Sequence, residues 1–130
     1  MDKVSALRSC SLFEGFTEIG LQILASIATE KEVPDGAPLY VEGMLGDTLY
    51  ILIEGEVRVA MKDAQGTERT LTTLTAGESF GELALLGGGI RLASTYAVGP
   101  CRLLEIHAKD FTRLQRQKPQ ACLKLLMSIV

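Results

Sequence analysis

The sequence predicts a mainly β fold: a jelly-roll-like barrel with helices at both ends and one short helix inserted between strands. Between residues 31 and 107, turn residues divide the chain into short strands at nearly regular intervals, which is typical of barrels and jelly rolls. These turn residues are Asp35-Gly36, Gly46-Asp47, Glu54-Gly55, Asp63, Gly66, Gly77 and Gly99-Pro100. Outside this range, apolar residues recur at helical spacing. We expect one domain over residues 1–130, with a helical segment to about residue 30, the barrel over 31–107 and helices over 108–130.

The terminal segments contain start and stop signals for helices. Thr17 is a good N-cap residue for a helix that we expect to run to about Ala28. Its expected buried face consists of Ile19, Ile23, Leu24 and Ile27. Near the C-terminus, Pro119 separates a helix over 110–117 from a last helix that starts at about Gln120.

One expected strand alternates clearly between apolar and other residues. Val57, Val59 and Met61 should face inward. The intervening residues should face water, namely Arg58, Ala60 and Lys62.

Residues 80–94 place one carboxylate and one guanidinium around a glycine-rich turn. The apolar run 83–86 is long enough for about one helical turn, whose free N–H groups stabilise an anion. Gly81 lets the backbone approach a ligand closely, and the glycines at 87–89 can reverse the chain. Arg91 can then return over the same anion with a planar fork of donors. Glu82 would repel phosphate, so its natural partner is a hydroxyl such as those of ribose.

The charge of this segment restricts the ligand. It has one cation with no adjacent Lys, no Ser or Thr after a Lys, and no evident carboxylate pair for a metal. This set fits a singly charged phosphodiester better than a triphosphate with magnesium. The expected ligand is a nucleoside cyclic monophosphate, with no separate cofactor and no metal.

The same segment resembles the phosphate-binding cassette of the cyclic nucleotide-binding domain family, which includes catabolite-activator-type regulators and regulatory subunits of cyclic-nucleotide-dependent kinases. Residues 80–86 and Arg91-Leu92-Ala93-Ser94 follow the family pattern almost position for position. The likeness also covers residues 33–57, 74–80 and 102–111, which resemble the strands of that β-roll and the helix after them. Gly87 and Ile90 depart from it, since an aromatic residue and a Pro are often seen there.

The resemblance implies a ligand-binding set. Its members are Gly81, Glu82, Leu83, Ala84, Arg91, Leu92, Ala93 and Ser94, with Val59 and Leu71 as an apolar wall against the purine. Leu92 stands where family members that prefer guanine often have Thr or Ser, which favours cyclic AMP over cyclic GMP. The Ser94 hydroxyl could still serve a syn guanine or a phosphate oxygen. The final helix has no aromatic lid, so Leu126, Met127 or a partner chain would cap the base.

The implied function is a non-enzymatic sensor module. A ligand held by Glu82 and Arg91 would pull the cassette inward and let the C-terminal helix pack over it. The output would pass through a partner protein, a second copy of the chain, or an effector region absent from it. The alternative is a degenerate β-roll that serves only as a protein-interaction scaffold. A metal-dependent jelly-roll enzyme is disfavoured because His107 is the only histidine.

Composition restricts the expected binding partners and the expected cellular location. A net charge of −3 and a pI near 5.2 argue against direct nucleic-acid binding. No apolar run approaches the roughly 20 residues that a membrane span needs, and the N-terminus has no signal-peptide core. The three widely spaced cysteines fit reduced thiols, so we expect a cytoplasmic protein.

Overall fold

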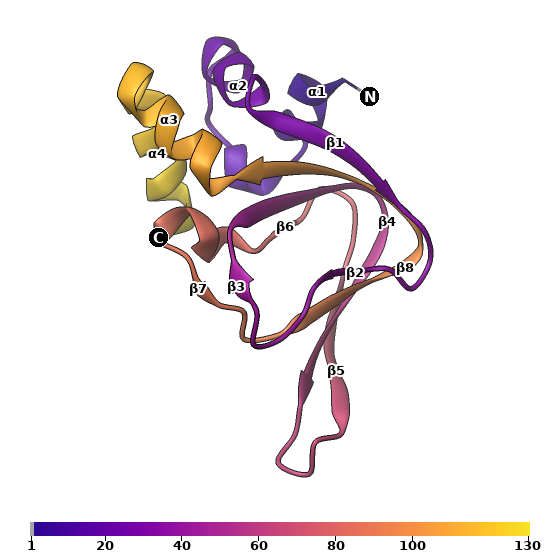
Figure 1. Cartoon of the computed structure of the whole chain (residues 1–130). Coiled ribbons are helices and arrows are strands. Elements are labelled where there is room, and N and C mark those ends of the chain that lie inside the picture. Colours follow the sequence, from indigo (N-terminus) through magenta and orange to yellow (C-terminus); the bar gives the residue numbers. More distant parts are fainter. Residues whose placement is uncertain (1) are drawn as a thin grey trace.

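Strands make up the middle of the chain, and helices gather at one end of the sheet (Figure 1). The computed structural model describes residues 2–130. The helical elements are α1 (Lys3–Arg8), η1 (Ser11–Phe13), α2 (Glu18–Ala25), η2 (Glu82–Leu86), α3 (Ala108–Gln117) and α4 (Pro119–Ile129). The strands are β1 (Ala28–Val33), β2 (Pro38–Tyr40), β3 (Leu45–Gly46), β4 (Thr48–Lys62), β5 (Glu68–Leu74), β6 (Ser79–Phe80), β7 (Gly89–Ile90) and β8 (Ser94–His107). The structure thus has the mainly β fold with flanking helices that the sequence predicts.

Two long strands, β4 and β8, organise the sheet. Its strand order is β1-β8-β4-β5, with β2 added on β8 and β6 added on β4, and all pairs are antiparallel. A separate ladder joins β3 to β7, pairing Leu45 with Ile90 and Gly46 with Gly89. This short ladder connects the cassette to the chain just before β4.

Two of the expected turns are bends inside these long strands. Gly55 lies within β4 and Pro100 within β8, and the register between the two strands shifts on both sides of Glu54. Gly55 has φ of +98°, and a Cβ there would lie 2.7 Å from the Pro100 carbonyl oxygen. The glycine therefore lets two bent strands stay paired where a turn was expected.

The predicted alternation in β4 is only partly confirmed. Val57 is fully buried and Val59 is half-buried, as inward-facing residues should be. Met61 is 37% exposed, and Ala60, expected to face water, is fully buried. β8 begins at Ser94, opposite Ala60, so beyond that point β4 pairs only with β5 in a hairpin that projects from the body (Figure 1). Met61 lies on that projecting part and has no core to face.

α2 starts as predicted and buries most of the expected face. The Thr17 hydroxyl oxygen accepts a hydrogen bond from the Gly20 N–H at 3.0 Å. The helix ends at Ala25 because β1 begins at Ala28, so the expected end near Ala28 is wrong. Leu24 is buried, and Ile23 and Ile27 pack half-buried against the core, as expected. Ile19 is 70% exposed instead, and Leu21, which was not expected on this face, is buried.

The C-terminal helices meet at Pro119 as the sequence predicts. α3 follows β8 directly, Lys118 ends it, and Pro119 takes the first position of α4. Phe111 of α3 and Leu125 of α4 are buried in a core that also includes residues of β4 and β8. Within residues 2–130, no helix combines the length and the apolar character needed to cross a membrane.

Candidate ligand-binding site

A glycine lies next to each end of the short helix of the cassette. η2 follows Gly81, whose φ is +78°, and precedes Gly87, whose φ is +115°. The next two glycines also have positive φ, so the chain reverses and enters β7. This is the turn that the sequence predicts, and it returns the chain to Arg91.

The Arg91 side chain packs under the cassette and is only 8% exposed as a residue. One terminal nitrogen donates to the Thr48 carbonyl oxygen at 2.7 Å and the other to the Gly81 carbonyl oxygen at 3.3 Å. Its Nε is buried and has no hydrogen-bond partner within residues 2–130. An arginine has five N–H donors, so three remain for another acceptor.

Within residues 2–130, Arg91 also lacks a counter-ion. It takes part in none of the salt bridges found among the described residues, although arginines on the surface do. A buried charge without a partner is costly, and proteins rarely keep one without a functional use. The arrangement therefore favours an anion as the missing partner.

Two residues outside the predicted set pack against this guanidinium. The Tyr40 ring centroid lies 4.0 Å from Arg91 Cζ. Gly46, on β3, has no side chain, and a Cβ there would lie 2.3 Å from Arg91 Nε.

Tyr40 belongs to a cluster of three aromatic rings. The rings of Tyr50 and Phe80 stack with centroids 5.0 Å apart, and Tyr40 lies 6.1 Å from each of them. Burial raises the pKa of the Tyr40 phenol, and burial followed by the charge of Glu105 raises the pKa of Tyr50 to about 12. Both phenols are therefore neutral at physiological pH, so neither of them adds a negative charge that would compete with a bound anion.

Glu82 lies at the first position of η2 and is half-buried. Its Oε1 accepts a hydrogen bond from the Ser79 hydroxyl at 2.7 Å. That bond holds the carboxylate without a cation, and a carboxylate has further lone pairs for hydroxyl donors. The site thus presents a cationic donor, Arg91, and a separate hydrogen-bond acceptor, Glu82.

A cavity of about 210 Å³ lies over these groups. The predicted residues that line it are Gly81, Glu82, Leu83, Ala84, Arg91, Leu92 and Ala93. Sequence reasoning missed the other lining residues, namely Tyr40, Gly46, Gly88, Gly89 and Ile90. Gly46 belongs to the predicted Gly46-Asp47 turn, although only as a turn residue, whereas nothing in the pattern singles out Tyr40.

Three predicted residues are not among those that line this cavity. The Ser94 hydroxyl accepts a hydrogen bond from the Glu42 N–H at 2.8 Å, so it holds the segment after β2. Val59 lies half-buried on β4. Leu71 is 57% exposed, and β5 bulges there, because Val59 pairs with Thr72 and Ala60 with Thr70.

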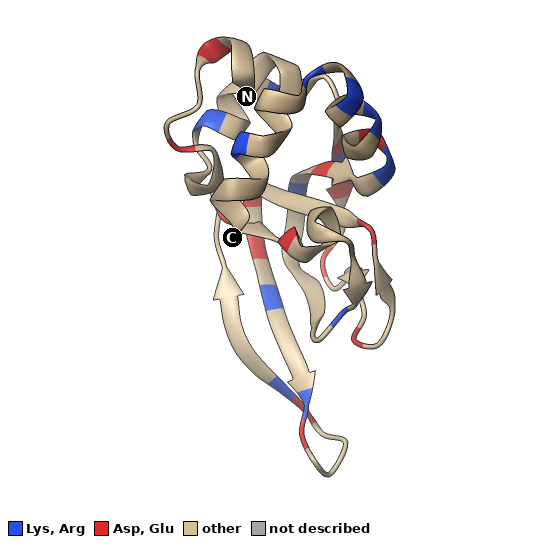
Figure 2. Cartoon of the chain, turned by 90° about the vertical axis from the view of Figure 1, so that its left-hand side faces the viewer, with Lys and Arg blue, Asp and Glu red and all other residues tan. Residues whose placement is uncertain are grey.

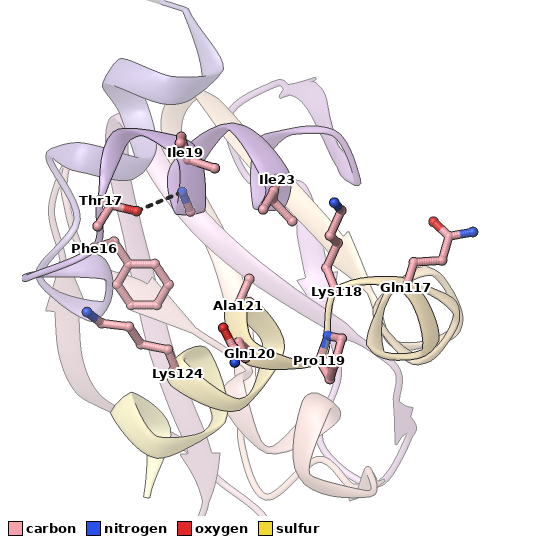
Figure 3. A pocket seen from close by; sticks show the side chains of 11 residues that line it. Phe16, Thr17, Ile19, Ile23, Gln117, Lys118, Pro119, Gln120, Ala121 and Lys124 are labelled. Atoms are coloured by element: carbon pink, nitrogen blue, oxygen red, sulfur yellow. Dashed lines mark hydrogen bonds between the residues drawn. The ribbon is translucent and has the colours of Figure 1, made fainter.

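A larger hollow of about 450 Å³ lies elsewhere, between α2 and the α3–α4 junction (Figure 3). Ile19 and Ile23 lie on one side, and Pro119 and Ala121 on the other. Lys118 and Lys124 are the charged residues that line it; both are exposed, and the Lys124 Nζ donates to the Gly15 carbonyl oxygen at 2.7 Å. This hollow therefore offers no charged group comparable to the buried Arg91.

The described residues offer little for a metal site or for a nucleic-acid-binding surface. Within residues 2–130, no three His, Cys, Asp or Glu side chains lie close enough to hold a metal ion. Lys and Arg are spread along the ribbon among Asp and Glu, except that α3 carries three of them, Lys109, Arg113 and Arg116, beside one Asp (Figure 2).

Comparisons with known proteins agree with this geometry. The family model of the cyclic nucleotide-binding domain matches residues 30–118. The Cyclic AMP receptor protein of Thermus thermophilus is 35% identical over 113 residues, which make up 87% of this chain and 52% of that protein. The chain spans about half the length of the curated relatives it matches.

Solved structures show the same likeness. The N-terminal domain of a transcriptional regulator from Streptomyces coelicolor has a TM-score of 0.86 at 28% identity, covering 95% of this chain and 87% of that one. The regulatory domain of Toxoplasma gondii PKA, solved with cAMP, has a TM-score of 0.79 at 29% identity. That match covers 87% of this chain and 44% of the other.

Proposed function

The chain belongs to the cyclic nucleotide-binding domain family, and we propose that its cassette binds a nucleoside 3′,5′-cyclic monophosphate. One observation carries the proposal: Arg91 is buried, has no carboxylate partner among residues 2–130 and keeps three N–H donors free. A singly charged phosphodiester would complete the ion pair. Glu82 would accept hydrogen bonds from the ribose hydroxyl, and the backbone at Gly81 would lie close to the ring.

Further donors support the phosphate role of this loop. None of the hydrogen bonds found within residues 2–130 uses the backbone N–H of Leu92 or Ala93, both of which line the cavity. Free backbone N–H groups beside an arginine form a common anion-binding arrangement. The phosphate would then be held by one side chain and by the loop that follows it.

We propose cyclic AMP as the preferred nucleotide. The cavity encloses about 210 Å³ near the cassette, so the purine would extend toward the β4–β5 hairpin. There Val59 and the exposed Leu71 would offer apolar contact without hydrogen-bond readout. Leu92 is 70% exposed and has no hydroxyl to bond a guanine. The names of the relatives, which include a cyclic AMP receptor protein, support the same preference.

The signal would pass from the cassette to the C-terminal helices. η2 contacts both α3 and α4. A ligand that bonds Glu82 and Arg91 together would favour an inward cassette through its differential contacts, and α4 would repack over it. Leu126 or Met127 of α4, or a partner chain, would cap the base. The output would then pass to a partner protein, a second copy of the chain or an effector region beyond it. We propose a regulatory rather than enzymatic role, in the cytoplasm.

Ligand-dependent melting tests the proposal. A ligand at about 100 times its Kd stabilises the folded state by about 2.7 kcal/mol, which should raise the Tm by about 5–15 °C for a domain of this size. Cyclic AMP should produce the largest shift, cyclic GMP a smaller one and 5′-AMP almost none. Arg91→Ala should reduce the shift to about a third or less under the same conditions, since it should weaken binding by about 2–5 kcal/mol. Equal Tm values with and without every cyclic nucleotide would reject the sensor function and leave the β-roll as an interaction scaffold.

A further inference from the structure

We propose that Tyr40 is a positioning residue for the anion site, whose ring holds the Arg91 guanidinium in the plane that presents its free donors. The inference rests on the proposed function for its ligand, but the geometry behind it does not. Arg91 Cζ lies 4.0 Å from the centroid of the Tyr40 ring. A cation at this distance over an aromatic face is attracted by the ring quadrupole.

Three contacts together restrain the guanidinium. The carbonyl oxygens of Thr48 and Gly81 accept from its two terminal nitrogens. These bonds restrain two edges of the fork, whereas the Tyr40 ring restrains one of its faces. A guanidinium restrained in this way loses little freedom when an anion binds, so the site is pre-organised.

The Tyr40 ring is itself held in place. It lies at the end of β2, where Tyr40 pairs with Thr95 on β8. Its other neighbours are the rings of Tyr50 and Phe80, each 6.1 Å away. The Tyr40 ring therefore lies between the Tyr50 and Phe80 rings and the Arg91 guanidinium.

The hydroxyl of Tyr40 plays no visible part in this arrangement. No hydrogen bond found within residues 2–130 uses it, whereas the hydroxyls of Tyr50 and Tyr96 both donate to protein oxygens. The ring face is thus the functional part, and phenylalanine should replace tyrosine at this position.

Two measurements on the full chain test the inference. The first is the NMR signal of the Arg91 Nε–H, which needs no ligand. Burial should slow its exchange with water, and the ring current of Tyr40 should move it upfield. Tyr40→Phe should keep both properties, whereas Tyr40→Leu should lose the upfield shift and exchange faster. Tyr40→Met serves as a second variant if Tyr40→Leu fails to fold.

The second measurement is affinity for cyclic AMP by calorimetry. Loss of a cation–π contact predicts a fall of about 2- to 30-fold for Tyr40→Leu, while Tyr40→Phe should stay within about twofold. Tyr96→Leu is the matched control, because Arg58 lies 4.7 Å from the Tyr96 ring centroid and neither residue lines the cavity. It should leave affinity and the Arg91 signal unchanged.

The outcomes separate the two proposals. An unchanged Arg91 signal in Tyr40→Leu, or equal effects of Tyr40→Phe and Tyr40→Leu, would overturn the positioning role. If the unmodified chain binds no cyclic nucleotide, the proposed function fails, and the Arg91 signal alone still decides whether Tyr40 holds the guanidinium.

Discussion

Replacing Gly46 with alanine should displace Arg91 without straining the backbone. Gly46 is not among the glycines with positive φ, so its backbone tolerates a side chain. The three heavy atoms nearest to an added Cβ all belong to Arg91, at 2.3 Å for Nε, 2.5 Å for Cζ and 2.8 Å for Cδ. Side-chain Cβ atoms essentially never approach closer than 3.0 Å, so Nε must move by at least about 0.7 Å.

The displacement has a predictable cost. Moving the guanidinium breaks its hydrogen bonds to the carbonyl oxygens of Thr48 and Gly81, each worth about 0.5–1.5 kcal/mol. We therefore expect Gly46→Ala to lower the free energy of unfolding by about 1–3 kcal/mol. In an Arg91→Ala background the clashing atoms are absent, so the same substitution should be nearly neutral. The coupling energy between the two changes should therefore be about 1–3 kcal/mol as well.

Urea unfolding of the four proteins in this cycle measures that coupling without any ligand. Gly20→Ala is the matched control, since Gly20 also lacks positive φ and its nearest neighbours are Thr17 and Phe16. Its effect should be additive with Arg91→Ala. If Gly46→Ala destabilises both backgrounds equally, Arg91 is not the residue that fills the space beside Gly46, and the described geometry of the site is wrong.

Three further predictions concern affinity, pH and thiol chemistry. Arg91→Ala should weaken cyclic AMP binding by about 2–5 kcal/mol because the phosphate loses its counter-ion. Glu82→Ala should weaken binding less, since water can replace its hydrogen bonding to ribose. Calorimetry that gives equal or inverted losses of affinity contradicts both roles. Burial raises the pKa of Tyr50 to about 12, so the unfolding free energy should fall as the pH rises from about 10 through about 12, because the unfolded phenol loses its proton first. Tyr50→Phe should lack this part of the fall in alkaline urea unfolding, and an identical pH profile for both proteins would exclude Tyr50 as its source. Burial also raises the pKa of the Cys10 thiol, so at about pH 8 iodoacetamide should alkylate Cys10 only in denaturant; rapid labelling of the native protein, mapped by mass spectrometry, would argue against burial.

The sequence alone predicts the cassette well because its signals are local. Gly81, Glu82 and Arg91 lie within eleven consecutive residues, and positive-φ glycines both open and close the turn. The caps and breaks of the helices are equally local, and the structure confirms Thr17 as an N-cap and Pro119 as a helix start.

Long-range pairing determines the features that sequence reasoning missed. Tyr40 and Gly46 reach Arg91 through strands of only two or three residues, β2 and β3, which are too short to produce a periodic pattern. The sequence predicts a turn at Gly55 because a glycine in a bent strand and a glycine in a turn look the same in sequence. Likewise, the exposure of Met61 depends on where β8 begins, which alternation within β4 does not encode.

Calorimetric titration of the chain with cyclic AMP, with 5′-AMP as the control that lacks the cyclic diester, tests the central claim most directly. We predict saturable binding of cyclic AMP at one site per chain, little heat with 5′-AMP, and affinity for cyclic AMP at least about 30-fold weaker in Arg91→Ala. Absence of binding by the unmodified chain, or equal affinity of the unmodified chain and Arg91→Ala, would contradict the assignment of the cassette and its buried arginine as a cyclic nucleotide site.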